Sequence, residues 1–198
     1  MKRASFLVAA VFAIAAFISF NNVSAKDSLA IGAKLENFTL TDANGAAKSF
    51  NELKGKNGAV LVFLSVQCPV VKAYNERIVK LADDYAAKGI NVIGINSNAT
   101  ETSDKIKIHT AENYKFPVLI DKGNILADQL GANITPETFY FNAANVLVYH
   151  GAIDNSKSSD SITTNFLRDA LDANLSGKAV AKTSANAFGC SIKRAEKN

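Results

Sequence analysis

The change of sequence period around Cys68 constrains this chain more than any other feature. Residues 59–64 read AVLVFL, a continuous apolar run rich in β-formers, which is typical of a strand buried on both faces. Beyond Pro69 the apolar residues recur at three- and four-residue steps, as in an amphipathic helix: Val71, Tyr74, Ile78, Leu81 and Tyr85. Pro69 suits the first turn of that helix, and Gly89 ends it. The sequence therefore predicts a buried strand, Cys68 and a long helix in direct succession.

The rest of the pattern predicts an α/β fold. Residues 38–49 read as a β-hairpin around Asn44-Gly45, a dipeptide that accepts positive φ. One helical turn is expected over residues 50–53. We expect further strands over residues 91–96, 116–120, 137–141 and 146–150, and helices over residues 103–114, 125–130 and 162–175. Alternating strands and helices that finish with a hairpin and a helix predict a central mixed sheet.

The first 25 residues have the pattern of a secretory signal peptide. Lys2 and Arg3 precede an uncharged apolar run over residues 6–20, and small residues at 23–25 follow. We expect cleavage after Ala25 and export across the inner membrane, into a bacterial periplasm. The alternative is a retained anchor, for which the run is short. The predicted parts are a signal peptide (1–25), one folded domain (26–176) and a C-terminal tail (177–198).

Charge gives no indication of a nucleic-acid partner. Loss of the leader lowers the formal charge from +4 to about +2, and no dense basic run lies outside the tail. No glycine-rich phosphate loop is present. His109 and His150 have no cysteine or carboxylate cluster at ligand spacing. We therefore expect no cofactor, no metal and no membrane contact after cleavage, and the sequence leaves the oligomeric state open.

Cys68 has the position of a reactive thiol. A cysteine at the start of a helix lies among free backbone N–H groups and at the positive end of the dipole, which both favour the thiolate. Lys72, one turn further on, could add positive charge near the sulfur. The competing interpretation is a buried apolar cysteine. Export implies an oxidising compartment, so Cys68 and Cys190 could also form one long-range disulfide.

Several stretches resemble the thioredoxin fold. The strand VLVFL, the cysteine that begins a long helix, and Thr135-Pro136 before ETFYF match that fold. More narrowly, ENFTLTDANGAAKSFNELKG, CPVVKAY, GINSN, PVLID, ITPETFYFN and FGCSIK are similar to a peroxiredoxin-like (redoxin) subgroup of the alkyl hydroperoxide reductase and thiol-specific antioxidant superfamily. The resemblance covers almost all of residues 26–198. It implies a three-layer thioredoxin-like domain in which Pro136 is cis and faces Cys68.

At several positions this chain differs from thioredoxins and peroxiredoxins, and these differences limit the reactions expected of it. Thioredoxins carry a second cysteine where this chain has Val71, and a tryptophan where it has Gln67. Ser65 fits the hydroxyl that peroxiredoxins place three residues before their peroxidatic cysteine. The peroxide-binding arginine of that family falls at Pro136, however, and their upstream proline falls at Leu61. The set of residues that activates peroxide is therefore largely missing.

With these differences, the resemblance implies a single attacking thiol and a second thiol that lies far away in the sequence. We expect a thiol–disulfide oxidoreductase in which Cys68 attacks and Cys190 resolves the mixed disulfide. Pro136 and Thr135 would shape the substrate groove, with Ser65 and Gln67 beside it. The partners would be protein or small-molecule thiols and disulfides. Two alternatives stay open: a thiol peroxidase with antioxidant activity, in which Ser65 assists, and a non-catalytic binding domain with a structural disulfide.

Overall fold

The computed structural model describes residues 28–196. Its strands are β1 (Thr39–Asp42), β2 (Ala47–Ser49), β3 (Gly58–Leu64), β4 (Ile90–Asn96), β5 (Val118–Ile120), β6 (Ile134–Thr135), β7 (Glu137–Asn142), β8 (Leu147–Gly151), β9 (Ser184–Ala185) and β10 (Cys190–Ser191). Its helices are α1 (Phe50–Leu53), α2 (Pro69–Ala86), α3 (Ser103–Asn113), α4 (Ile125–Leu130) and α5 (Phe166–Leu175). The expected signal peptide lies outside the described residues and stays a prediction.

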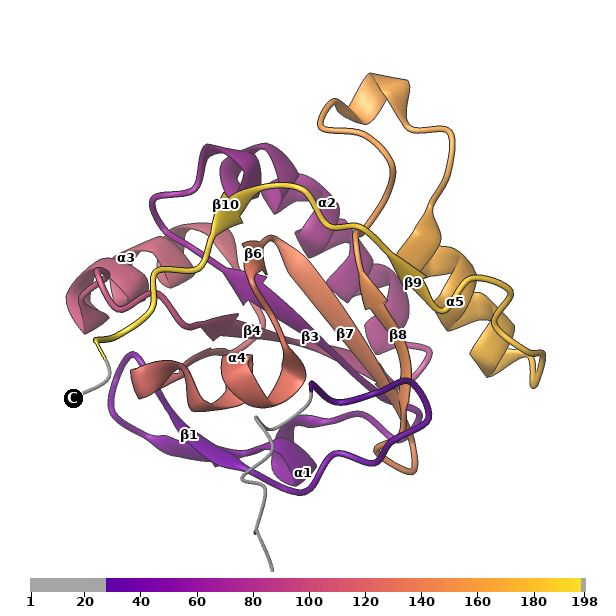
Figure 1. Ribbon diagram of the computed structural model, residues 1–198, viewed down its shortest axis with the longest axis horizontal. Coiled ribbons are helices and arrows are strands. Elements are labelled where there is room, and N and C mark those ends of the chain that lie inside the picture. The colour runs from indigo at the N-terminus through magenta and orange to yellow at the C-terminus, as the bar shows by residue number, and fades with distance from the viewer. Residues whose placement is uncertain (1–27, 197–198) are drawn as a thin grey trace, which may run out of the picture.

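A mixed sheet forms the centre of the molecule (Figure 1). Among residues 28–196 its strand order is β2-β1-β5-β4-β3-β7-β8-β9. Strands β3, β4 and β5 run parallel, whereas β7 and β8 continue the sheet in antiparallel fashion. The N-terminal hairpin of β1 and β2 pairs with β5. The expected α/β class and central mixed sheet are therefore confirmed.

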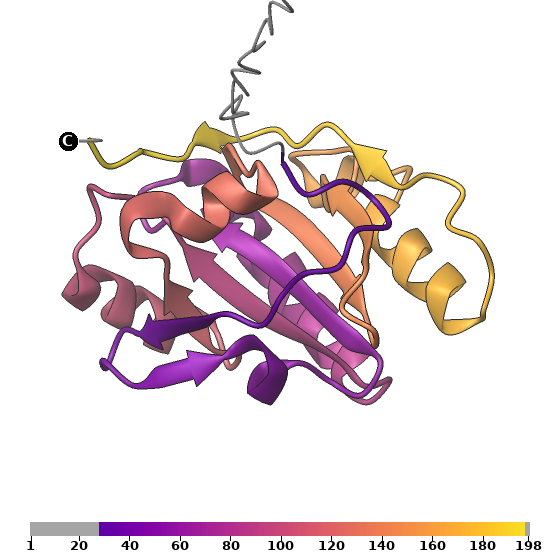
Figure 2. The ribbon, with the colours of Figure 1, turned by 60° about the horizontal axis from the view of Figure 1, so that its bottom comes forward.

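Helices cover both faces of this sheet, which gives three layers (Figure 2). One apolar cluster joins the sheet to α2, α3 and α5. A second cluster, on the opposite face, joins it to α1 and α4. Strand β3 contributes to both clusters because its side chains alternate between the faces, and all seven of its residues are buried. Cys68 therefore follows a fully buried strand after the short turn of residues 65–67.

Helix α2 matches the sequence pattern closely. It begins at Pro69, with Cys68 as the residue that precedes its first turn. The five residues predicted for its buried face are the ones that the structure buries. Gly89 follows the helix with a φ of +77°, which a side chain would disfavour. The helix and the sulfur at its start are thus positioned by packing that the sequence already encodes.

Two predicted boundaries are wrong by more than one residue, and each has a local cause. Strand β5 begins at Val118 rather than at residue 116, because Pro117 has no N–H to offer a ladder. Helix α5 begins at Phe166 rather than at residue 162. The side chain of Asn155 accepts hydrogen bonds from the N–H groups of Thr163 and Thr164, which holds that stretch in a loop.

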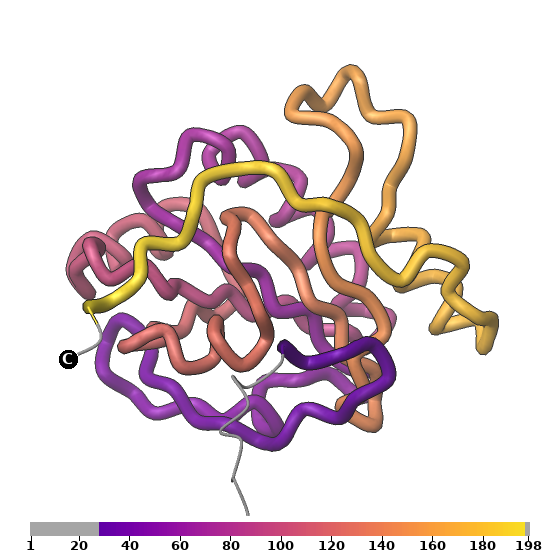
Figure 3. Tube along the Cα trace, in the orientation of Figure 1, coloured from indigo at the N-terminus to yellow at the C-terminus, as the bar shows by residue number. Residues whose placement is uncertain are grey.

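The C-terminal tail is more ordered than its composition indicates. Strand β9 pairs in parallel with β8, and β10 pairs antiparallel with β6 in a separate two-stranded sheet. The tube in Figure 3 shows the tail crossing the molecule from α5 toward the α3 side, over the loop that precedes α2. Among the described residues, no helix has the length and apolar character needed to span a bilayer.

Candidate active site

The candidate site lies where β3 ends and α2 begins. Cys68 is 1% exposed and has extended backbone angles just before the helix. Free N–H groups at a helix start favour a negative charge there. Of these donors, the N–H of Val71 interacts with the Cys68 sulfur. The local sequence thus gives the sulfur a hydrogen-bond donor that needs no other side chain.

The Thr135–Pro136 segment faces Cys68 from β6. The peptide bond between these two residues is cis, as the resemblance implied, and both residues are buried. The Cys68 thiol donates to the backbone oxygen of Thr135, with Sγ and O 3.2 Å apart. The structure therefore brings Cys68 together with the Thr135–Pro136 pair, which lies 67 residues further along the chain and was expected at the same site.

Cys190 reaches the site from the tail. In β10 it pairs with Thr135 of β6, and its Sγ lies 2.7 Å from the Sγ of Cys68. Both cysteines are free thiols in this structure. A disulfide bond measures about 2.05 Å, so only a small movement separates the pair from bond formation. We call residues 188–194, which carry Cys190 over the site, the strap.

The two thiols differ in acidity. Burial raises the pKa of Cys68, but hydrogen bonds from the Cys190 thiol, from the N–H of Val71 and from the backbone N–H of Cys190 outweigh burial, so its pKa lies below the ordinary value. Burial and the charge of the neighbouring Cys68 thiolate raise the pKa of Cys190. Cys68 is therefore the sulfur that ionises first, and Cys190 keeps its proton and donates it to that thiolate.

Glu101 organises the turn before Cys68, and it was not among the residues expected at the site. Its carboxylate accepts from the Ser65 hydroxyl at 2.6 Å and from the backbone N–H groups of Val66 and Gln67, both at 3.0 Å. The Asn96 side chain donates to it at 2.6 Å. The only available signal was the position of Glu101 after β4, since the carboxyl ends of parallel neighbours such as β3 and β4 meet at one edge.

Ser65 and Gln67 lie at the site in different roles from those of a peroxidase. The single proton of the Ser65 hydroxyl is directed at Glu101, so it is not offered to a substrate beside Cys68. The Ser65 oxygen accepts from the Gln67 N–H at 3.3 Å, and the Gln67 side chain is exposed. Both residues line a hollow of about 210 Å³ together with Cys68 and Cys190.

Lys72 lies on the side of α2 that faces α3. Its exposed side chain lines a hollow between α2 and α3 with His109 and Glu112. Burial lowers the pKa of His109, and the charge of Lys72 lowers it further. The groups that lower the pKa of Cys68 are those named above, so this geometry does not support the expected action of Lys72 on the thiolate.

Both histidines pack against aromatic rings. His109 meets Tyr114 edge-on, with ring centroids 5.6 Å apart, and His150 stacks on Phe139 at 5.7 Å. Within residues 28–196 no group of three or more His, Cys, Asp or Glu side chains is arranged to hold a metal ion. The reactive groups that the structure brings together at the site are its two sulfurs.

A buried strand that leads into a helix-start cysteine, opposed by a cis-proline segment, defines a thioredoxin-fold protein. The solved structures agree. A hypothetical protein from Sinorhizobium meliloti has a TM-score of 0.78 at 34% identity, over 86% of this chain and 98% of that chain. A conserved protein from Geobacillus kaustophilus has a TM-score of 0.79 at 30% identity, over 87% and 96%. The exposed lipoprotein thioredoxin of Streptococcus pneumoniae shares the fold, with a TM-score of 0.55 at 20% identity over 72% and 99%.

The family is given by residues 31–150, which match the AhpC/TSA family. The chain belongs to that family, and the resemblance drawn from its motifs is confirmed. Thiol-disulfide oxidoreductase ResA of Halalkalibacterium halodurans is 30% identical over 143 residues, 71% of this chain and 80% of that protein. Thiol:disulfide interchange protein DsbE of Yersinia pestis is 28% identical over 130 residues, 65% and 67%. These relatives support the expectation of a thiol-dependent oxidoreductase.

Proposed function

We propose that the protein is an exported thiol–disulfide oxidoreductase whose redox couple is Cys68 and Cys190. The observation that carries this proposal is the 2.7 Å separation of the two sulfurs, combined with their opposite pKa shifts. A thiolate beside a protonated thiol is the reduced form of a dithiol couple. The pair replaces the local dithiol that the chain lacks, since Val71 stands where thioredoxins have their second cysteine.

The reaction runs through one mixed disulfide. The Cys68 thiolate attacks one sulfur of a substrate disulfide, the substrate S–S bond breaks, and the released substrate thiolate takes up a proton from water. Cys190 then loses its proton and attacks the Cys68 sulfur. The Cys68–Cys190 disulfide forms as the second substrate thiol leaves. Two electrons pass from the protein to the substrate, and the reverse sequence oxidises a substrate dithiol.

In this proposal, Thr135 and Pro136 hold the backbone of the substrate protein against the Cys68 sulfur. The backbone of Thr135 already pairs with an extended segment, β10, and its oxygen lies 3.2 Å from the Cys68 Sγ. Glu101 fixes the turn formed by residues 65–67, which places the start of α2. The partners are proteins or small molecules that carry thiols or disulfides.

A thiol peroxidase is the weaker candidate, on two observations. The Ser65 hydroxyl donates to Glu101, and Pro136 stands where peroxiredoxins carry their peroxide-binding arginine. A permanent clamp between the tail and the domain is the other alternative. In that case Cys68 would have no need of a lowered pKa, whereas an exchanging thiol does.

Trapping of the mixed disulfide tests the proposal. A small aromatic disulfide is added to the reduced protein and to the C190S and C68S variants, and the products are mapped by mass spectrometry. We expect wild type to end as the Cys68–Cys190 disulfide, C190S to accumulate a mixed disulfide on Cys68, and C68S to react slowly. Equal reactivity of C68S and wild type would refute the assignment of Cys68. Rapid conversion of Cys68 to sulfenic acid by peroxide, with no disulfide exchange, would favour the peroxidase.

Export is a separate part of the proposal, and it rests on residues 1–25. N-terminal sequencing of protein from a periplasmic extract should begin at Lys26. A chain that starts at Met1 and stays with the membrane fraction would instead indicate a retained anchor.

A further inference from the structure

The strap stands between Cys68 and any outside disulfide. Cys68 is only 1% exposed although it lies in a loop, and the Cys190 Sγ lies 2.7 Å from its sulfur. The strap is held on both sides of Cys190: the Phe188 ring meets the Tyr74 ring edge-on at 6.0 Å, and Ile192, at 5% exposure, joins the apolar cluster around α4. A partner therefore has to displace part of the strap before it can meet the Cys68 sulfur.

The strap is bound as a strand. Cys190 pairs with Thr135 and Ser191 with Ile134, and the Thr135 hydroxyl donates to the Cys190 backbone oxygen at 3.4 Å. The Ile192 N–H donates to the Asn133 backbone oxygen at 2.9 Å. Any extended segment can form backbone hydrogen bonds of this kind. Specificity for one segment over another therefore has to come from its side chains.

Gly189 lies directly before Cys190. It is the position at which the β6 edge accepts glycine and excludes residues that have a Cβ. A Cβ at Gly189 would lie 2.0 Å from the Thr135 backbone oxygen, 2.8 Å from its carbonyl carbon and 3.2 Å from the Ile134 Cγ2. The obstacle is backbone, so it cannot rotate away as a flexible side chain would. The Thr135 oxygen also lies 3.2 Å from the Cys68 Sγ, so it has little room to move away from Gly189 on that side. Only glycine fits between β6 and the cysteine in this register.

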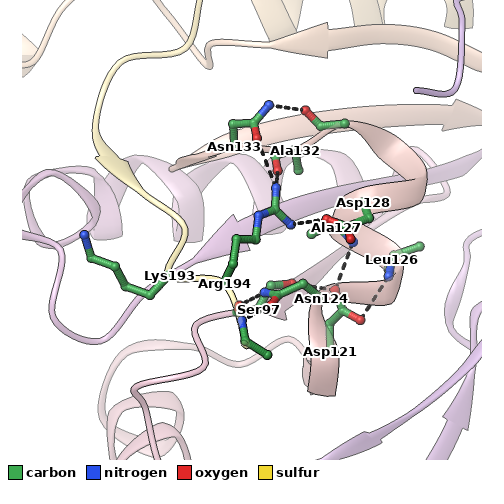
Figure 4. A network of polar contacts seen from close by, with 12 residues as sticks. Ser97, Asp121, Asn124, Leu126, Ala127, Asp128, Ala132, Asn133, Lys193 and Arg194 are labelled. Carbon is green, nitrogen blue, oxygen red and sulfur yellow. Dashed lines mark hydrogen bonds and ion pairs between the residues drawn. The ribbon is translucent and has the colours of Figure 1, made fainter. Parts of the chain in front are cut away.

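The far end of the strap is fastened more firmly than the end at Phe188. Lys193 pairs with Asn98 and Ala99, through hydrogen bonds of 3.0 and 2.9 Å. Arg194 forms an ion pair of 2.7 Å with Asp128 and donates to Asn133, as Figure 4 shows. Before Cys190, the Phe188 side chain makes aromatic contact with Tyr74 and lies 5.9 Å from the Lys157 Nζ. Residues 188–191 can thus leave β6 while residues 192–195 stay bound.

We infer that residues 188–191 are an internal occupant of a strand-binding site on β6, and that a partner protein replaces them with an extended segment in which glycine directly precedes the reacting cysteine. The inference rests on the proposed function for its chemistry, and it adds the sequence class of the partner. The partner cysteine takes the place of the Cys190 sulfur, in line with Cys68, and the attack that follows is the exchange already described.

Alkylation of Cys68 in the reduced full-length protein tests the fit of Gly189. The G189A change should force residues 188–191 off Thr135 and raise the rate of Cys68 alkylation at least about tenfold, the effect of about 1.4 kcal/mol. The S191A variant, with its change on the same strand at an exposed side chain, should stay within about twofold of wild type. Equal rates for G189A and wild type would overturn the inference. This readout needs no disulfide exchange, so it does not depend on the proposed function.

Capture of peptides by the C190S variant tests the partner's sequence. Two nine-residue peptides with the sequence of residues 186–194 carry an aromatic leaving thiol on their cysteine, and one has alanine in place of its glycine. We expect Cys68 to capture the glycine peptide at least about tenfold faster. Equal capture, or capture of neither peptide while a small disulfide reacts, would overturn the inference and leave the proposed function intact. If the small disulfide does not react with Cys68 either, the proposed function is refuted. The inference about the strap is then tested by the G189A alkylation rate alone.

Discussion

The acidity of Cys68 arises from its immediate neighbours. The sulfur is buried, which disfavours the thiolate, yet three donors reverse that effect. One of them, the N–H of Val71, is a consequence of helix geometry. Another, Cys190, arrives from a position 122 residues further along the chain. The sequence predicted the first contribution from the spacing of α2, and it attributed to Lys72 a role that the structure gives to Cys190.

Alkylation of Cys68 as a function of pH should separate these contributions. We expect a midpoint below the ordinary value of about 8.5. The C190A change removes a donor to the thiolate and should raise the midpoint, whereas K72M should leave it unchanged because Lys72 faces His109. The midpoint is read with iodoacetamide on the reduced protein. A shift in K72M equal to that in C190A would contradict this account.

Glu101 illustrates a residue whose role depends on contacts that no local pattern reveals. In E101Q, one carboxylate oxygen becomes an NH₂ group and faces donors of the turn before Cys68. We expect the free energy of unfolding to fall by about 2 kcal/mol and the Cys68 alkylation midpoint to move. The control is E112Q, at an exposed side chain on α3, which should change the free energy of unfolding by less than about 0.5 kcal/mol. Urea unfolding checks both values, and equal stabilities would contradict the assigned role.

At the scale of elements, long periodic segments were predictable and two-residue strands were not. Helix α2 and its buried face follow from the sequence because eighteen residues repeat one pattern. Strands β6, β9 and β10 have two residues each, which is too short for a period. They exist because the tail is drawn across the domain by anchors such as Ile192. The motif around Cys190 was visible in the sequence, but the β6 edge that receives it was not.

The anchor at Ile192 should stabilise the whole tail. Replacement by alanine in I192A removes most of an apolar side chain that is 5% exposed, and we expect a loss of about 2 kcal/mol in the free energy of unfolding. Ile125 is 71% exposed, so I125A should cost less than about 0.5 kcal/mol. I192A should also increase the alkylation rate of Cys68. If both variants unfold at the same urea concentration, Ile192 does not anchor the strap.

For the whole molecule, the two sulfurs tie the last segment of the chain to its most buried strand. Oxidation closes a loop whose ends are 122 residues apart. In the chain-entropy account such a loop stabilises the folded state by about 4–5 kcal/mol. The net gain is smaller, because oxidation removes the hydrogen bonds that the Cys68 thiolate accepts. The fold class and the pair of cysteines were predictable because they rest on patterns. Their proximity was expected from the roles assigned to them, but the path of the tail that produces it follows no local pattern and was not predictable.

The oxidised protein should therefore unfold at a higher denaturant concentration than the reduced protein. We expect a difference of about 2–4 kcal/mol in the free energy of unfolding, measured with and without reductant. The C68S/C190S double variant should show no dependence on reductant. An oxidised form less stable than the reduced form would show that the disulfide distorts the site.

A redox titration tests the central claim most directly. The protein is equilibrated in glutathione buffers of increasing oxidising strength, and the Cys68 and Cys190 thiols are counted by alkylation and mass spectrometry. The account predicts one reversible two-electron transition between the dithiol and the Cys68–Cys190 disulfide, approached equally from both sides. Two thiols that stay free in the most oxidising buffer, or a disulfide that no glutathione buffer reduces, would contradict it.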